Sequence, residues 1–149
     1  MIKTYLAIAI VAATMIYSAA WAQSASPIGL WKSIDDRTGK PTAIIRITEV
    51  EGRFQGRIEK VFPEPGESAN PVCGECKGEL KDQPIVGMII LSELRHVGDE
   101  YTEGLILDPD DGKLYRCTVR LFDGGNRLNI RGYIGIPLLG RTQVWLREQ

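Results

Sequence analysis

The stretch that decides the fold runs from Lys113 to Tyr133 and reads KLYRCTVRLF, then DGGN, then RLNIRGY. In both longer runs apolar and polar side chains alternate, as they do in a strand that buries one face. The DGGN segment between them, Asp123 to Asn126, supplies glycine where a tight hairpin needs a positive φ. The stretch therefore predicts two antiparallel strands joined by a short turn.

Short alternating runs separated by turn residues continue in both directions from this hairpin. Glu51-Gly52 and the segment from Asp108 to Gly112 offer the same turn chemistry, and no amphipathic helix of useful length interrupts the series. The predicted strands are 28–34, 42–50, 53–62, 85–91, 101–107, 113–122, 127–133 and 141–147. Consecutive hairpins pair neighbouring strands in order, and strands of this number can close into a barrel without exposed edges. We therefore predict an all-β, antiparallel, up-and-down barrel of eight strands.

The alternation also sorts side chains into an interior and an exterior set. The interior set is Ala43, Ile45, Ile47, Phe54, Ile58, Tyr115, Cys117, Val119, Leu121, Leu128, Ile130, Thr142, Val144 and Leu146. The opposite faces carry mostly arginine, and on the last strand Arg141, Trp145 and Arg147 are assigned to the exterior. An aliphatic interior of moderate size is compatible with a packed core or with a small ligand cavity.

The first 22 residues have the pattern of a secretory signal peptide. Lys3 provides the positive charge, residues 5–17 form an apolar run, and Ala20-Trp21-Ala22 is a cleavage motif of small residues. The apolar run is too short for a convincing transmembrane helix. We therefore expect cleavage after Ala22, a single domain over residues 23–149, and a periplasmic or secreted protein without a transmembrane segment.

Charge and motif content exclude several classes of function. Without the signal peptide the chain has 17 basic and 19 acidic residues, because only Lys3 is lost from the 18 basic residues of the full sequence. Such a near-neutral, interspersed charge is not that of a nucleic-acid binder or a polybasic membrane protein. His96 is the sole histidine, and no Gly-x-Ser-x-Gly motif occurs. We therefore predict no catalytic residues, no cofactor and no enzymatic activity.

The segment 63–84 breaks the series of hairpins with a long loop that carries Cys73-Gly74-Glu75-Cys76. In an oxidising compartment this pair is expected to form a structural disulfide, while thiol-disulfide exchange and metal binding stay as alternatives. Cys117 is expected to be a buried free thiol, since it lies on an apolar strand face.

Two groups of residues could in principle bind a metal ion. Cys73, Cys76, Cys117 and His96 are the only cysteine or histidine candidates outside the signal peptide, and their spacing matches no zinc motif. Asp108, Asp110 and Asp111 precede Gly112, but this spacing fails the pattern of an EF-hand calcium loop and fits a hairpin turn. We therefore predict no metal site.

Aromatic and arginine residues near the ends of the predicted strands are the remaining candidates. In a closed barrel the first and last strands meet, so an arginine can lie across a tryptophan ring and seal one end. The alternative is a recognition patch, because Tyr, Trp and Arg dominate binding sites. The candidate ligand-binding residues are Trp31, Tyr115, Arg131, Tyr133, Arg141 and Trp145, the arginines for a carboxylate or phosphate group and the aromatics for an apolar body.

Several motifs of the chain resemble the bacterial exported family called domain of unknown function 2147. They are Gly29-Leu30-Trp31, residues 83–88, Asp108-Pro109 with Asp111-Gly112-Lys113 and Tyr115, Arg131-Gly132-Tyr133, and residues 139–147. The resemblance implies a small exported barrel of the calycin kind and brings no activity or catalytic residue. Lipocalins are similar in a weaker way, because their first strand also opens with Gly-x-Trp and their last strand packs an arginine on that tryptophan.

From these observations we expect an exported, non-enzymatic binding protein for a small apolar or amphipathic molecule that enters near the long loop. A second hypothesis is a protein-interaction module of the cell envelope that docks through surface arginines and an outward Trp145. A third is thiol-disulfide exchange through Cys73 and Cys76. A protein partner is compatible with all three, and a nucleic-acid partner with none.

Overall fold

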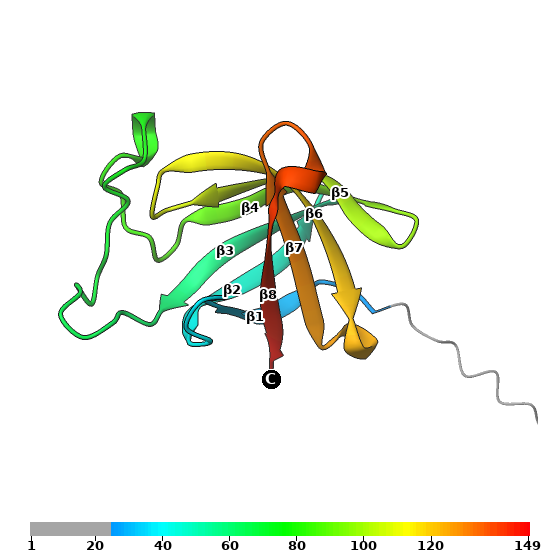
Figure 1. The fold of residues 1–149 in the computed structure, drawn as a ribbon, viewed down its shortest axis with the longest axis horizontal. Helices are drawn as coiled ribbons and strands as arrows, with labels where there is room; N and C mark the ends of the chain where they lie inside the picture. Colours follow the sequence, from blue (N-terminus) through cyan, green and yellow to red (C-terminus); the bar gives the residue numbers. More distant parts are fainter. Residues whose placement is uncertain (1–24) are drawn as a thin grey trace, which may run out of the picture.

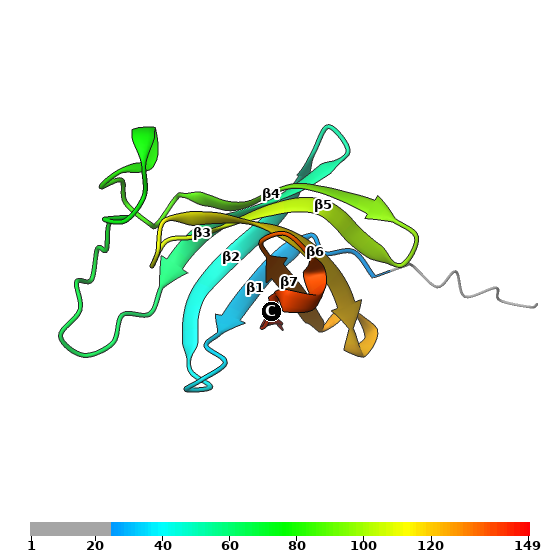
Figure 2. The ribbon, with the colours of Figure 1, turned by 45° about the horizontal axis from the view of Figure 1, so that its top comes forward.

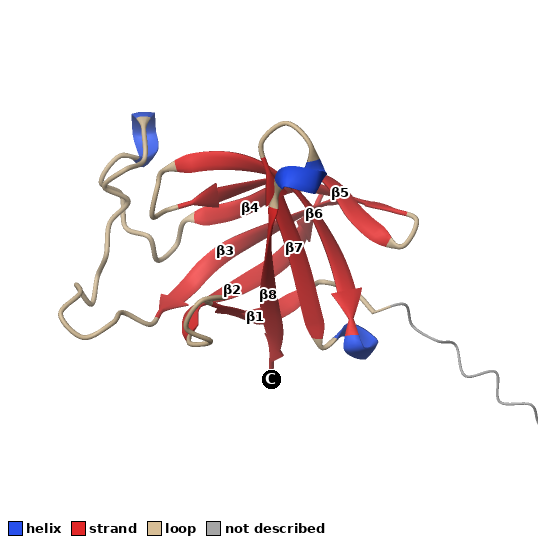
Figure 3. Ribbon diagram, viewed as in Figure 1, coloured by secondary structure: helices blue, strands red, loops and turns tan. Residues whose placement is uncertain are grey.

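The computed structural model describes residues 25–149, so the predicted signal peptide and its cleavage site after Ala22 lie outside the described residues. Figures 1 and 3 show strands throughout, with short 3-10 turns between some of them. The strands are β1 (Gly29–Ile34), β2 (Pro41–Val50), β3 (Arg53–Val61), β4 (Ile89–Val97), β5 (Glu100–Asp108), β6 (Lys113–Phe122), β7 (Arg127–Tyr133) and β8 (Arg141–Glu148). The 3-10 turns are η1 (Gly78–Leu80), η2 (Asp123–Gly125) and η3 (Pro137–Leu139). None of these helical turns in residues 25–149 has the length and apolar character needed to cross a bilayer.

The strands form a closed barrel in which each strand pairs antiparallel with the next. Pairing of β1 with β8 closes the ring, with Trp31 opposite Arg147 and Ser33 opposite Trp145. Figure 2 shows the curved strands from a second direction. The predicted all-β, up-and-down, eight-stranded barrel is therefore confirmed. Closure removes the free sheet edges that would otherwise invite pairing with other chains.

The up-and-down topology places the connections at two ends, which we call the closed end and the open end. The turns β2–β3, β4–β5 and β6–β7 lie at the closed end, together with the C-terminus. The connections β1–β2, β3–β4, β5–β6 and β7–β8 lie at the open end. The long β3–β4 connection, drawn in green, extends away from the barrel (Figure 1).

The barrel core confirms most of the predicted interior. On β2, β3 and β7 the residues assigned inward are buried, and so are Cys117 and Val119 on β6. The side chains without exposed surface include Trp31, Ile47, Leu91, Leu94, Val119 and Leu128. Leu121 packs against this core while partly exposed. Period-two alternation therefore identified the inward faces of these strands correctly.

On β8 the predicted inward and outward faces are wrong. Trp145 is 1% exposed and Leu146 is 43% exposed, so the interior face is the one that carries tryptophan and arginine. The arginines at both ends of this face reach past the barrel rims: Arg141 bonds Asp36 at the open end, and Arg147 bonds backbone carbonyls at the closed end. Long side chains can bury their stems while their charged groups find partners elsewhere, so arginine does not mark an exterior face.

The predicted fourth strand, 85–91, also differs from the structure, in which β4 covers Ile89–Val97. Glu93 has a φ of 62° and the pairing of β3 with β4 shifts register nearby, which is the geometry of a β-bulge. Because of the bulge, Leu91 and Leu94 both point inward although they are three positions apart. The strand therefore continues through Arg95 and His96, where the sequence lacks simple alternation.

Candidate functional site

The closed end is sealed by Trp31 and Arg147. The guanidinium of Arg147 lies 4.3 Å from the centroid of the Trp31 ring. It donates hydrogen bonds of 2.7, 3.0 and 2.6 Å to the carbonyl oxygens of Gly125, Ile28 and Ser26. The indole N–H of Trp31 donates to the carbonyl of Pro27 at 2.7 Å. The predicted packing of an arginine across a tryptophan ring at this end of the barrel is therefore confirmed.

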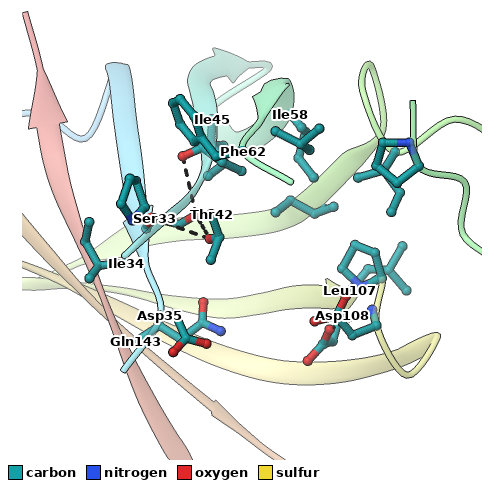
Figure 4. A pocket seen from close by; sticks show the side chains of 18 of the residues that line it. Ser33, Ile34, Asp35, Thr42, Ile45, Ile58, Phe62, Leu107, Asp108 and Gln143 are labelled. Atoms are coloured by element: carbon teal, nitrogen blue, oxygen red, sulfur yellow. Dashed lines mark hydrogen bonds between the residues drawn. The ribbon is translucent and has the colours of Figure 1, made fainter. Parts of the chain in front are cut away.

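The open end contains a cavity of about 1090 Å³ that opens to solvent. Its floor and lower walls are apolar and come from β2, β3, β4, β5, β7 and β8: Ala43, Ile45, Ile58, Ile90, Ile106, Ile130 and Trp145. Figure 4 shows Ile45, Ile58 and Leu107 from different strands around this space. The barrel is therefore packed in its closed half and hollow in its open half.

A few polar side chains lie among the apolar residues of the cavity. The hydroxyl groups of Ser33 and Thr42 are 2.5 Å apart (Figure 4). The Trp145 indole N–H points to Oε1 of Gln143 at 3.4 Å, a long hydrogen bond. Ser33, Thr42 and Gln143 also line the cavity, so a ligand that enters deeply meets hydroxyl and amide groups there. Such isolated polar groups in an apolar site orient a ligand.

The long connection between β3 and β4 forms one wall of the cavity mouth. Residues of this connection that line the cavity include Phe62, Glu64, Glu67, Val72 and Ile85. An antiparallel bridge between Val72 and Pro84 and a disulfide between Cys73 and Cys76 hold it together. The Sγ atom of Cys73 lies 3.4 Å from the carbonyl oxygen of Pro109, so the disulfide rests on the β5–β6 turn.

The disulfide predicted between Cys73 and Cys76 is confirmed, and its surroundings disfavour thiol-disulfide exchange. Cys73 is 0% and Cys76 is 3% exposed, and neither lies at the start of an α-helix. Exchange needs an accessible sulfur that an attacking thiolate can reach. The third cysteine, Cys117, is free and buried, as expected, and burial raises the pKa of its thiol to about 12.

Thiol titration checks this cysteine assignment. We expect no reactive thiol in the native, unreduced protein at pH 8, because Cys117 is buried and protonated there. One thiol should react after unfolding in denaturant and three after unfolding with a reductant. A dithionitrobenzoate assay measures each number. More than one thiol in the unfolded, unreduced protein would contradict the disulfide.

Charged side chains at the cavity mouth are mostly acidic. Six acids line it, namely Asp35, Glu64, Glu67, Glu75, Asp108 and Asp110, against three bases, Arg37, Lys40 and Arg141. Two of these bases already have partners: Arg141 bonds Asp36 through Nε at 2.8 Å, and Lys40 lies 3.0 Å from Glu64. The mouth therefore has an excess of negative charge.

Asp110 illustrates the electrostatics of the mouth. Burial and the neighbouring carboxylates of Asp108 and Glu67 raise the pKa of Asp110. Nearby, the Tyr115 hydroxyl donates to Asp111 at 2.5 Å, which lowers the pKa of Asp111 and raises the pKa of Tyr115 to about 12. A positive charge placed near Asp110 would favour its ionised form.

The aspartates between β5 and β6 form a turn, as predicted. Oδ1 of Asp108 accepts the backbone N–H of Asp110 at 2.9 Å, and Oδ1 of Asp111 accepts that of Lys113 at 2.8 Å. Within residues 25–149, no three cysteine, histidine or acidic side chains gather as a metal ion would require.

The structure separates the six predicted ligand-binding residues into two groups. Tyr115, Arg141 and Trp145 line the cavity. Trp31 lies below it in the closed half, and Arg131 points outward, where it bonds Thr142 and the carbonyls of residues 137 and 138. Tyr133 shares the outward face of β7 with Arg131, because it is two residues further along the strand. The arginines proposed for an anionic group are therefore outside the cavity or already paired with a carboxylate.

Residues missed by the sequence analysis supply much of the cavity. Ser33, Thr42 and Gln143 are ordinary strand residues, and Asp35, Glu64 and Glu67 belong to loops with no motif. The other acids of the mouth lie in the Cys-x-x-Cys segment and at the β5–β6 turn, whose patterns indicate a disulfide and a hairpin turn and give no sign of a cavity. The one available signal was the alternation on β8, which places Gln143 on the same face as Trp145 once that face is assigned inward.

Comparisons with known proteins agree with this architecture. A family model described as "Uncharacterized protein conserved in bacteria (DUF2147)" matches residues 29–147. Among curated proteins none matches the chain. A solved structure, protein HP1028 from Helicobacter pylori, which is described as belonging to the lipocalin family, superposes with a TM-score of 0.68 at 21% identity. The superposition covers 83% of this chain and 84% of that protein, and at this identity it shows a shared lipocalin-like fold.

Proposed function

We propose that this chain, which belongs to the bacterial family DUF2147, is an exported binding protein for a small apolar or amphipathic molecule. The observation that carries the proposal is the cavity of about 1090 Å³ with an apolar floor at the open end of a lipocalin-like barrel. Cavities of about 300–1,000 Å³ with a few polar groups are typical of small-molecule sites. The protein binds its ligand without transforming it.

The charge of the mouth favours a ligand whose polar end is neutral or cationic. Six acids surround the mouth, and two of its three bases are paired with carboxylates. A ligand carboxylate or phosphate would have to compete with Asp36 for Arg141 and would lie near Asp108 and Asp110. Like charges at such separations repel, whereas an ammonium group would be attracted.

Export is part of the proposal. A disulfide in a bacterial protein is typical of the periplasm or of secreted proteins, and the first 22 residues have the pattern of a signal peptide. The hypothesis of a docking surface around an outward Trp145 is not favoured, because this side chain is 1% exposed.

A substitution that fills the cavity with a large side chain tests whether the ligand binds there. Ala43 lines it and is 7% exposed, so Ala43→Trp places a large ring in the space that a ligand would occupy. We expect the affinity for the neutral fluorescent probe N-phenyl-1-naphthylamine to fall about tenfold or more. Fluorescence titration of the purified protein measures this change.

The matched control is Val50→Trp, which adds the same ring to a side chain that is 49% exposed at the closed end. We expect this variant to bind the probe like the wild-type protein. Equal affinity in Ala43→Trp and the wild type, with both folded by circular dichroism, would contradict binding in the barrel.

Competition with charged amphiphiles measures whether the cavity prefers a ligand with a cationic or an anionic polar end. Dodecylamine and dodecanoate have the same chain length and opposite charge at pH 7. We expect dodecylamine to displace the probe at a concentration about tenfold lower, because of the acidic mouth. A preference for dodecanoate would contradict the proposal that the polar end of the ligand is neutral or cationic, but it would not contradict ligand binding in the cavity.

A further inference from the structure

The connection between β7 and β8 exposes an unusual group of aliphatic side chains. Ile134, Ile136, Leu138 and Leu139 are 67%, 54%, 81% and 79% exposed, within six consecutive residues. Exposed apolar groups gathered in one place mark interaction surfaces more often than single exposed residues do. We propose that this segment, which we call the apolar tip (residues 134–139), inserts into the surface of a phospholipid bilayer.

The backbone conformation of the apolar tip is fixed by contacts with the rest of the barrel. Arg131 lies beneath it and donates from Nε to the carbonyl of Pro137 at 2.9 Å and from Nη2 to that of Leu138 at 3.0 Å. A third hydrogen bond, of 3.1 Å, joins Nη1 of Arg131 to Thr142. Gly140 fits closely below the tip, since a Cβ there would lie 2.4 Å from the carbonyl oxygen of Gly132. These contacts fix the backbone of the tip in a conformation in which its aliphatic side chains are exposed to solvent.

Part of the backbone of the tip, residues 136–140, has hydrogen-bond partners within the protein. The N–H groups of Leu139 and Gly140 donate to the carbonyls of Ile136 and Pro137 within η3, and proline has no N–H group. The carbonyls of Pro137 and Leu138 are bonded by Arg131. Unpaired backbone groups are costly in lipid, and these groups have partners.

Residues next to the tip are of the types that are favoured at the interface between the hydrocarbon and the headgroups of a bilayer. Arg116 on β6 pairs with Tyr133 on β7 immediately before the tip, and both are on the outer surface. Within residues 25–149, neither Arg116 nor Arg131 has a salt bridge to a carboxylate. Tyrosine and arginine are favoured where hydrocarbon meets the charged lipid headgroups. The acids of the cavity mouth belong to the end of β5 and to the connections β1–β2, β3–β4 and β5–β6.

The tip also lies beside the cavity, because the residues that flank it, Gly132 and Arg141, line the mouth. Figure 1 shows the connection between β7 and β8, with η3 in orange, at the end of the barrel opposite the C-terminus. Insertion would therefore bring the mouth close to the membrane surface. The insertion itself does not depend on ligand binding, so each property can fail without the other.

Vesicle binding tests the inference. Vesicles of phosphatidylethanolamine and phosphatidylglycerol are sedimented with the wild-type protein and with the double variant Leu138→Ser and Leu139→Ser. We expect the wild type to bind and the double variant to bind at least about tenfold more weakly, because two exposed leucines are lost. The matched control is Val50→Ser with Val97→Ser, which removes two aliphatic side chains, 49% and 51% exposed, at the closed end.

Depth of insertion provides the second measurement. In Leu138→Trp the new indole should be quenched by lipids with brominated acyl chains, while the buried Trp31 and Trp145 should be unaffected. The inference is overturned if the wild type does not bind vesicles, if both double variants lose binding equally, or if the new indole is not quenched. Self-association that only the Leu138 and Leu139 variant loses, without vesicle binding, would identify the tip as a contact between copies and also overturn it.

Probe binding separates this inference from the proposed function. We expect the Leu138→Ser and Leu139→Ser variant to bind N-phenyl-1-naphthylamine like the wild type, since neither leucine lines the cavity. Loss of vesicle binding with intact probe binding supports insertion by the tip.

Discussion

Replacing Trp31 by alanine is expected to lower the free energy of unfolding by about 3–5 kcal/mol, the usual cost of removing a large buried aromatic. Trp31 is 0% exposed, its indole N–H donates to Pro27, and the guanidinium of Arg147 lies over its ring. The variant therefore loses core packing, a buried hydrogen bond and the surface on which Arg147 rests. Urea denaturation followed by tryptophan fluorescence or circular dichroism measures the change.

Leu146→Ala is the comparison for Trp31→Ala. Leu146 lies on the neighbouring strand but is 43% exposed on the outer face of β8, so we expect a loss below about 1 kcal/mol. If Leu146→Ala destabilised the protein as strongly as Trp31→Ala, the assignment of the β8 faces would be wrong. If Trp31→Ala cost less than about 1 kcal/mol, the closed end would not depend on the seal.

Gly112→Ala should produce the second large effect, because Gly112 lies where the disulfide loop meets the β5–β6 turn. A Cβ at Gly112 would lie 2.0 Å from the carbonyl oxygen of Glu75, so one of the two loops must move. The left-handed φ of 67° adds strain of about 1–2 kcal/mol for any residue with a Cβ. We expect the unfolding free energy to fall, and the hydrogen bond from the Cys73 N–H to Gln83 to exchange faster with deuterium.

Gly98→Ala is the control that distinguishes the steric contact with Glu75 from the backbone strain of a positive φ. Gly98 has nearly the same φ, 66°, but a Cβ there would meet no atom within 4 Å. We expect Gly112→Ala to be about 2 kcal/mol more destabilising than Gly98→Ala, since only the former displaces a neighbouring loop. Equal losses in the two variants would show that the disulfide loop does not rest on the turn at Gly112.

Strand order and closure were predictable because they follow from local signals. The DGGN turn at Asp123 and the glycine at position 112 define hairpins, and hairpins in series produce an up-and-down barrel. The Gly-x-Trp motif at Trp31 and the arginine at position 147 also met as expected, because closure brings the first and last strands together.

The two errors in the strand analysis have physical causes that a local pattern does not contain. On β8 both faces carry apolar and polar residues, and the pairing with β1 decides between them, because it places Trp145 opposite the inward, buried Ser33. On β4 the bulge at Glu93 shifts the alternation by one residue, and this shift depends on pairing with β3.

The sequence by itself determined which segments other than β4 extend, which neighbours pair, which faces of β2, β3, β6 and β7 are apolar, and which two cysteines are joined. These properties depend on residues close together in the chain or on a simple period of two. Only the tertiary structure decided that the open half is hollow, that acids from three connections surround its mouth, and that Arg131 holds the apolar tip outward. Those properties arise from register, bulges and contacts between distant segments, which act only once the barrel has closed.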